Sequence, residues 1–263
     1  MKQRISICSD HIKKDFSLQD ALEFCKSNNY LIEIHQKHFD ELFALNKFDS
    51  IIAIHPHWRN YSLSTDDPSW FNRSIDYLTN LIEFVNKNGI KYMVIHPEGY
   101  PADLHKNNRA NIVLKAFQKL SSELNKYASC KLLIENIPPA SIFPPSDLPD
   151  YYIGERLEDM VPILEINPKF EFIFDLGHFL CSLNKYGNKE LEMLDNLTQK
   201  LTYIHVHDNN GEINDHSPLE REKSIQILRN IEEKSNPIYS FEMIPTISGL
   251  KNSIKIIKGI MNE

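Results

Sequence analysis

The sequence predicts an α/β protein built as a single (β/α)8 barrel over residues 1–263. The length suits one large barrel, short apolar segments alternate eight times with helical patterns, and the repeat of roughly 30 residues matches a strand–helix–strand unit. A doubly wound open sheet is the alternative fold. Such a sheet more often carries a glycine-rich loop after its first strand, and the turn Ser9-Asp10-His11-Ile12 contains no glycine. We therefore expect the closed barrel.

Eight apolar segments are the predicted strands. They are short, rich in Ile, Leu, Val, Phe and Tyr, and apolar on both faces. Parallel strands have this pattern when helices cover one face and a barrel core covers the other. The predicted strands are residues 4–8, 30–34, 50–54, 91–95, 131–134, 171–174, 201–206 and 237–241.

The segments between the strands have helical patterns. Ser17 is placed to cap the first helix, with Asp20 in its first turn. Residues 70–87 carry apolar side chains at every third or fourth position, and Gly89 follows as a stop. The predicted helices are residues 18–27, 39–47, 70–87, 104–127, 155–166, 189–199, 219–234 and 249–261.

The composition is that of a soluble globular protein, with 41% hydrophobic and 25% charged residues and a net charge of -7. It excludes disorder, collagen and coiled coil as the main state. No apolar run approaches the roughly 20 residues that cross a bilayer, and the apolar run after the basic N-terminus is too short for a signal peptide. The four cysteines form no Cys-x-x-Cys pair, so we expect reduced thiols in a cytoplasmic protein. The acidic balance argues mildly against a broad nucleic-acid surface. A homo-oligomer is left open.

Ionisable side chains follow most of the predicted strands, where a barrel of this kind carries its chemistry. One polar residue at a strand end usually marks only where the chain meets water, but a run of six strands that end in His, Asp or Glu is unexpected by chance. These side chains are ligands for Zn²⁺, Mn²⁺, Co²⁺ or Mg²⁺, and a cation removes the repulsion between converging carboxylates. The residues are His35, His55, His96, Glu135, Asp175 with His178, His205 and Glu242.

These motifs resemble those of the xylose isomerase-like TIM barrels, a superfamily that contains sugar and sugar-phosphate isomerases and epimerases and also endonuclease IV. The resemblance covers nearly the whole chain and is clearest between His55 and Glu242. The motifs that carry it occur in the family's order and are His55-Pro56, His96-Pro97-Glu98-Gly99, Glu135-Asn136, Asp175-Leu176-Gly177-His178, His205-Val206-His207-Asp208 and Glu242.

The resemblance implies two designs for the site. In the isomerase design, one divalent ion is held by the residues of strands five to eight, here Glu135, Asp175, His205 and Glu242. In the endonuclease design, three zinc ions are held, and the additional ligands correspond to His55, His96, His178 and His216. We expect one ion, or two or three under the second design.

The loop after strand seven favours the isomerase design. The Asp-x-His of the endonuclease design becomes Asn214-Asp215-His216 here, and the family's glycine-rich stretch after it is missing. The loop at residues 35–40 is short and mixed in charge, and the arginines are few and scattered, whereas an abasic-site nuclease needs basic and aromatic loops to hold bent DNA. We therefore expect a metal-dependent isomerase or epimerase for a sugar or sugar phosphate. The alternative is a multi-zinc phosphodiesterase for abasic DNA or another phosphoester, and a third interpretation is a barrel that binds a metal or ligand without turnover.

The isomerase design also implies roles. Glu135 and Glu242 would be the acid/base pair on an enediolate, and His178 would orient a hydroxyl or stabilise an oxyanion. In the phosphodiesterase design, His55, His96 and Glu135 would hold one ion of a two-metal hydrolysis. The expected substrate contacts are His57, Trp58, Asn136 and Arg221, with Arg59 as another candidate for a phosphate or carboxylate and rim packing as the other role of Trp58.

The remaining histidines have simpler expected roles. We expect His11, His38 and His105 to be solvated, and His207 to point away from His205 and pack against a helix. The same argument leaves His57 ambiguous. The loop at residues 138–152 is long for a strand–helix connection and is either a lid over the substrate or a rigid excursion.

Overall fold

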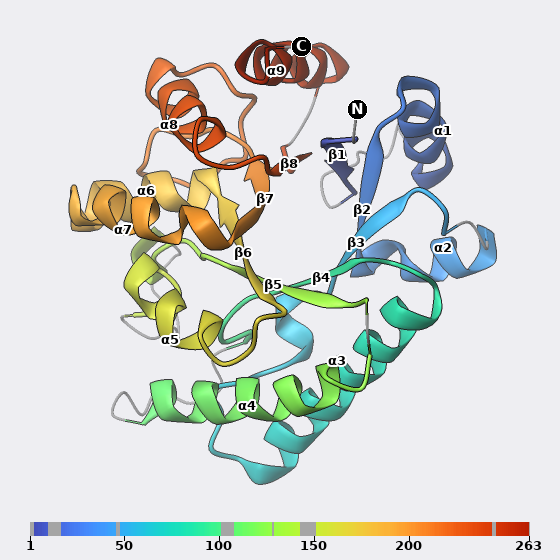
Figure 1. Ribbon diagram of the computed structural model, residues 1–263, viewed down its shortest axis with the longest axis vertical. Helices are drawn as coiled ribbons and strands as arrows, with labels where there is room; N and C mark the ends of the chain where they lie inside the picture. Colours follow the sequence, from blue (N-terminus) through green and yellow to red (C-terminus); the bar gives the residue numbers. More distant parts are fainter. Residues whose placement is uncertain are drawn as a thin grey trace.

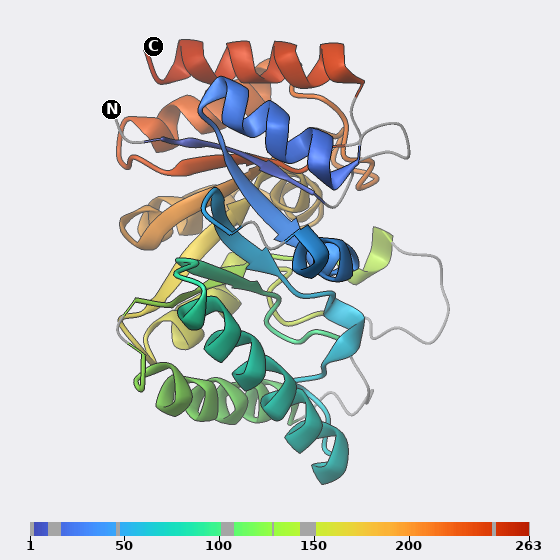
Figure 2. The same cartoon turned by 90° about the vertical axis from the view of Figure 1, so that its right-hand side faces the viewer.

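Eight parallel strands close into a barrel in the order of the chain, as the computed structural model shows. Strand β1 pairs in parallel with both β2 and β8, which closes the sheet. The structure describes residues 3–9, 17–45, 48–100, 108–127, 129–142, 151–243 and 246–262. Helices surround the strands, and α3 and α4 lie side by side along the outside in both views (Figures 1 and 2). The predicted (β/α)8 barrel is confirmed.

Each predicted strand overlaps a strand of the barrel. Several strands extend one residue further than predicted, so that their terminal ionisable residue is part of the strand. The strands are β1 (Ile5–Cys8), β2 (Leu31–His35), β3 (Ile51–His55), β4 (Tyr92–Ile95), β5 (Lys131–Glu135), β6 (Phe170–Asp175), β7 (Leu201–Val206) and β8 (Ile238–Phe241).

Most helix ends differ from the predicted ends by a few residues. The helix expected at residues 155–166 has only five residues in the structure. The capping box at the start of α1 is present, with Ser17 and Asp20 bonded to each other's backbone N–H. The helices are α1 (Leu18–Asn28), α2 (Phe39–Leu45), α3 (Pro68–Lys87), α4 (Arg109–Leu124), α5 (Met160–Leu164), α6 (Leu176–Tyr186), α7 (Lys189–Leu197), α8 (Glu222–Glu232) and α9 (Ile247–Ile260). No helix of the described residues is long and apolar enough to cross a bilayer.

Helix α6 follows β6 directly and was not predicted. Asp175 ends the strand and is also the N-cap of the helix, because its Oδ1 accepts a hydrogen bond from the His178 N–H at 2.6 Å. The motif Asp175-Leu176-Gly177-His178 is therefore a helix start. As a consequence, the His178 side chain is carried on the first turn of a helix at the mouth of the barrel.

The barrel interior has a small core of its own, formed by Ala53, Tyr92, Val94, Leu133, Ile173 and Tyr203. Successive side chains of a strand point to opposite faces, so a residue two positions after an inward-facing one also faces inward. Glu135 follows Leu133, Asp175 follows Ile173 and His205 follows Tyr203 at this spacing. The packed interior thus ends in a layer of ionisable side chains.

Two buried features hold the rim near β4. Gly99 has a φ of +67°, and a Cβ there would lie 2.5 Å from the Tyr61 ring and carbonyl oxygen, so only glycine fits. Arg109 at the start of α4 donates from Nε to Glu98 Oε1 at 2.9 Å, and the Ile153 N–H donates to Glu98 Oε2 at 3.1 Å. This pair ties α4 and the chain near Ile153 to the end of β4.

Candidate metal centre

Four buried side chains converge at the mouth of the barrel, and we call them the four-residue centre. Each offers a ligand atom, and these atoms lie within 4.8 Å of one another. Nδ1 of His205 is 3.0 Å from Glu135 Oε1, 2.9 Å from Glu242 Oε2 and 3.7 Å from Asp175 Oδ2. The centre consists of Glu135 from β5, Asp175 from β6, His205 from β7 and Glu242 directly after β8. The structure thus brings together the four residues that the isomerase design implied.

Glu33 of β2 lies behind His205 and was not predicted as a site residue. Nε2 of His205 is 3.0 and 3.1 Å from the two carboxylate oxygens of Glu33, and Ser240 donates its hydroxyl to Glu33 Oε2 at 3.1 Å. A carboxylate in this position fixes the ring orientation of a metal-binding histidine. With Nε2 directed at Glu33, the other ring nitrogen of His205 is the one that can bind a metal.

A second group of donors, the His55 group, shares Glu135 with the centre and consists of His55, His96 and Glu135. His96 Nε2 lies 3.3 Å and His55 Nε2 3.6 Å from Glu135 Oε2. His55 Nδ1 is 3.4 Å from Glu33 Oε1. These two histidines therefore lie close to the carboxylate that the four-residue centre also uses.

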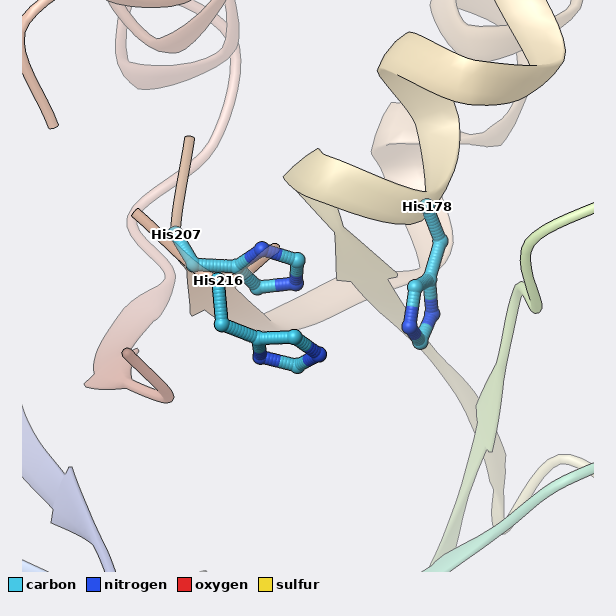
Figure 3. Close-up of side chains that lie close together, drawn as sticks. All are labelled: His178, His207 and His216. Atoms are coloured by element: carbon cyan, nitrogen blue, oxygen red, sulfur yellow. The ribbon is translucent and has the colours of Figure 1, made fainter. Parts of the chain in front are cut away.

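The third group is a cluster of three histidines, His178, His207 and His216 (Figure 3). The expectation that His207 points away from His205 is wrong, because residues two apart share a face. Its Nε2 is 3.0 Å from Asp175 Oδ2, and its ring stacks on that of His216 with centroids 3.9 Å apart. His207 nevertheless packs against a helix, as expected, since a Cβ at Gly177 of α6 would lie 1.9 Å from its Cε1.

The chemistry of the four-residue centre fits a divalent cation. Three carboxylates and one imidazole are buried together. Glu135 Oε2 and Glu242 Oε2 are both buried, and although imidazole nitrogens lie 3.3 and 2.9 Å away, neither oxygen receives a well-aligned hydrogen bond. A buried acceptor without a partner is costly, and a cation placed among these oxygens removes that cost. The donor set is suited to Mn²⁺, Co²⁺, Mg²⁺ or Zn²⁺.

Imidazolium groups balance the carboxylates when no metal is bound. Burial raises the pKa of Glu135, but the charges of His205 and His96 outweigh it and hold that pKa well below its ordinary value. Burial lowers the pKa of His205, but the carboxylates of Glu33, Glu242 and Glu135 outweigh it and raise that pKa well above its ordinary value. For His55, burial is outweighed by hydrogen bonding to Glu33 and by the charge of Glu135, so its pKa rises to about 9. The arrangement of carboxylates therefore favours positive charge between them, as protonated imidazoles or as a bound cation.

A cavity of about 330 Å³ opens at the centre. Imidazoles and the two glutamates alternate with apolar and aromatic groups, and no Lys or Arg is among the described residues that line it. Trp58 stacks on the rings of His57 and Tyr100, with centroids 6.1 and 5.8 Å away. The lining residues are His35, His55, His57, Trp58, His96, Gly99, Glu135, Ile137, Pro138, Tyr152, His178, Asn214, His216 and Glu242.

Two expected substrate contacts lie away from this cavity. Asn136 is buried, and its side chain bonds the backbone of Asp175 in both directions, at 2.8 and 3.0 Å. It therefore positions Asp175. Arg221 is an exposed residue next to α8, with Nε 3.8 Å from Asp208 Oδ1. Arg59 is also exposed and lies over the Trp58 ring, 4.9 Å from its centroid.

The remaining sequence expectations have mixed outcomes. His38 is half-buried and its Nε2 lies 3.0 Å from the Ser9 carbonyl oxygen, so it is not simply solvated. His11, His105 and residues 143–150 of the loop expected as a lid lie outside the described residues. The two ends of that loop, at Ile137-Pro138 and Tyr152, line the cavity.

Comparisons with known proteins agree with this architecture. Residues 18–258 match the family model described as xylose isomerase-like TIM barrel. An uncharacterized protein of Methanocaldococcus jannaschii, MJ1614, is 24% identical over 209 residues, which cover 77% of this chain and 76% of that protein.

Solved structures of similar fold include both an epimerase-like protein and an endonuclease. The IolI protein with a bound zinc atom superposes with a TM-score of 0.77 at 15% identity, covering 99% of this chain and 98% of its own. A D-tagatose 3-epimerase-like protein gives 0.74 at 20% identity, with 99% and 97% covered. Endonuclease IV from Thermus thermophilus gives 0.65 at 14% identity, with 98% and 99% covered. At these identities the likeness concerns the fold.

Proposed function

Since the chain belongs to the xylose isomerase-like TIM barrel family, we propose that it is a divalent-metal-dependent isomerase or epimerase of a small sugar. One observation carries the proposal. Glu135 and Glu242 both line the cavity, both belong to the four-residue centre, and each has a buried oxygen that receives no well-aligned hydrogen bond. Two carboxylates placed in this way can exchange a proton with a substrate carbon held between a metal and the cavity wall.

The four-residue centre would hold the ion through Glu135, Asp175, His205 and Glu242. A bound divalent ion polarises a carbonyl and its neighbouring hydroxyl and so lowers the cost of an enediolate. Glu33 keeps the His205 ring in place, and Asn136 keeps Asp175 in place. The centre is thus held rigid by outer partners, as a preorganised site requires.

The protein's own groups would move the proton. Glu135 and Glu242 are the acid/base pair, because both lie against the cavity and both are ionised in the buried site. Either carboxylate can therefore take a proton from the substrate carbon, and the proton it has taken up is the one returned to the carbon skeleton. His178 Nδ1 lies 2.9 Å from the Asn136 carbonyl oxygen, which accepts its proton and leaves Nε2 available for a substrate oxygen. The roles that the resemblance implied for these three residues are therefore kept in the proposal.

The cavity lining favours an uncharged sugar over a sugar phosphate. Phosphate recognition usually relies on Arg or Lys, and the described lining contains neither. Trp58, Ile137 and Tyr152 offer apolar surface for the carbon-bound hydrogens of a sugar, while the histidines offer partners for its hydroxyl groups. Such a mixture of flat apolar and polar groups suits a free or glycosidically linked monosaccharide unit.

A second candidate function is phosphoester hydrolysis at more than one metal ion. The His55 group favours it, because its two imidazoles share Glu135 with the four-residue centre and could hold a further ion next to it. The absence of basic residues from the described cavity lining weighs against a nucleic-acid substrate.

One experiment separates the candidates. A panel of ketoses and keto-glycosides is incubated with metal-loaded protein in D₂O, and exchange of carbon-bound hydrogen is followed by NMR. In parallel, incision of duplex DNA that contains an abasic site is measured. The proposal predicts exchange that is lost in Glu242→Gln and kept in Glu190→Gln. Glu190 is a buried glutamate away from the cavity whose side chain accepts the Leu157 N–H. Incision without exchange would establish the second candidate. The absence of both activities would favour a barrel that binds its ligand without turnover.

A further inference from the structure

His35 ends β2 and His57 follows β3, and both rings line the cavity. Neither residue belongs to a group of possible metal donors among the described residues. We propose that these two histidines, which we call the donor pair, donate hydrogen bonds from Nε2–H to substrate oxygens and so recognise the hydroxyl groups of a sugar remote from its metal-bound end. The inference rests on the proposed function, because it concerns the substrate of the same cavity.

A row of imidazole rings leads from the four-residue centre to the donor pair. The ring centroid of His55 lies 5.7 Å from that of His205 and 5.4 Å from that of His35. The His35 ring in turn lies 5.5 Å from the ring of His57. The donor pair is therefore further from the centre than His55 along this row. A sugar whose carbonyl end is held at the centre would extend its remaining carbons toward the donor pair.

The backbone determines which ring nitrogen of the donor pair carries the proton. His35 and His57 are each the N-cap of a short 3₁₀ turn. Nδ1 of His35 accepts the Lys37 N–H at 3.4 Å. Nδ1 of His57 accepts the Arg59 N–H at 3.2 Å. A ring nitrogen that accepts a hydrogen bond carries no proton, so the proton of each neutral ring is on Nε2, which is therefore a donor.

His178 gives the other side of the cavity the reverse polarity, since α6 follows β6, which lies across the closed barrel from β2. Its Nδ1 donates to the Asn136 carbonyl oxygen at 2.9 Å, so its Nε2 is an acceptor. A sugar hydroxyl can donate or accept, but at the donor pair its oxygen must accept. A carbon that bears only hydrogen would offer the donor pair no acceptor, which is costly where water is excluded. Uncharged N–H donors suit uncharged hydroxyl oxygens.

Neighbouring side chains hold the backbone of the donor pair in place. Ser9 Oγ accepts the His35 N–H at 2.7 Å. Gln36 Oε1 accepts the His57 N–H at 2.8 Å and the hydroxyl of Tyr77, which comes from α3, at 2.6 Å. Together with the bonds to Nδ1, these contacts fix both rings before a ligand arrives. Such preorganisation is what the recognition of one hydroxyl position requires.

The first measurement determines the tautomers by NMR. The full chain is labelled with ¹⁵N-histidine, loaded with Mg²⁺ and studied at a pH above the ordinary histidine pKa of about 6.5. The ring nitrogens are assigned from the signals lost in His35→Gln, His57→Gln and His178→Gln. The proton should be on Nε2 in the donor pair and on Nδ1 in His178. A proton on Nδ1 of either member of the donor pair would overturn the inference and leave the proposed function untouched.

The second measurement compares the ketohexose that exchanges fastest in D₂O with its 6-deoxy counterpart, which lacks the hydroxyl furthest from the carbonyl. The wild type should prefer the hydroxylated ketose by roughly 5–10-fold in kcat/KM, mainly through KM, since one neutral hydrogen bond is worth a factor of this order. His57→Asn keeps an acceptor for the Arg59 N–H but removes the Nε2 donor, so the preference should disappear. His57→Gln places an amide NH₂ near the lost Nε2–H and should keep the preference.

His38→Asn is the matched control, because His38 is outside the described lining of the cavity and its loss should leave the preference unchanged. Equal kcat/KM for the two ketoses in the wild type would overturn the inference, as would an undiminished preference in folded His57→Asn. No exchange with any ketose would overturn the proposed function, and the tautomers alone would then decide the inference.

Discussion

Glu33 provides the sharpest test of how the four-residue centre is organised. In Glu33→Gln, an amide replaces a buried carboxylate that contacts His205 Nε2 with both oxygens at 3.0 and 3.1 Å. The amide oxygen can still accept the His205 N–H, so the ring stays near its place. The negative charge that makes the ring a stronger ligand is lost.

The expected magnitude follows from the role of an outer partner. Removing such a partner costs about 10–100-fold in metal affinity, which is roughly 1.4–2.7 kcal/mol. The upper end is favoured here, because Glu33 is completely buried and also receives the Ser240 hydroxyl. In the variant, the amide NH₂ would face either the His205 N–H or the Ser240 hydroxyl, and both of these groups now donate to Glu33. Two donors would then meet without an acceptor, and this unsatisfied contact adds to the cost of the lost charge.

The assay is competition for Mn²⁺ or Co²⁺ against a chelator of known affinity. Glu190→Gln is the matched control, since Glu190 is a buried glutamate on α7 whose Oε2 accepts one backbone N–H. We expect weaker binding in Glu33→Gln and no change in the control. An affinity within about twofold of the wild type in folded Glu33→Gln would refute the idea that Glu33 orients a metal ligand.

Three further predictions concern the site and its rim. Glu135→Gln removes a metal ligand and one member of the acid/base pair, so any turnover should fall by at least about 100-fold and the metal content measured by mass spectrometry should fall with it. Unchanged metal content would place the ion elsewhere. The pKa of His55 is raised from 6.5 to about 9 in the folded protein, so protonation of His55 stabilises the metal-free fold. This stabilisation is fully present below pH 6.5 and is lost as the pH rises through 9, so the Tm of metal-free protein should fall between pH 7 and 9.5. A constant Tm would contradict the buried contact with Glu33. Gly99→Ala should destabilise the protein by at least about 1–3 kcal/mol in urea unfolding, because its Cβ would overlap Tyr61; wild-type stability would contradict the close approach.

The barrel could be predicted from the sequence because each strand is a short apolar segment, and most of these segments end in or are directly followed by His, Asp or Glu. Such segments are strongly specified by burial on both faces, and their order fixes a closed parallel sheet. Most of the donors were found for the same reason. Glu135, Asp175 and His205 each end or nearly end a strand, at the position where the interior core stops.

Glu33 and His207 were missed, although a signal for each was present. Glu33 lies two residues before His35 and His207 two residues after His205, so each shares the inward face with a residue already singled out. Glu33 looked like an interior strand residue, and His207 was assigned to the opposite face.

The roles of Asn136 and of α6 could not be predicted in the same way. The Asn136 amide is used by the backbone of the neighbouring strand, and this pairing depends on register between β5 and β6. Helix α6 begins inside the motif that supplies the candidate ligands Asp175 and His178, because Asp175 is also the N-cap of the helix. When one residue has two roles, a sequence pattern that indicates the first role gives no sign of the second.

Anomalous X-ray diffraction from crystals of the protein loaded with Zn²⁺ or Mn²⁺ tests the central claim most directly. The account predicts a peak among Glu135, Asp175, His205 and Glu242. Well-ordered crystals of metal-saturated protein with no peak at the mouth of the barrel would contradict it.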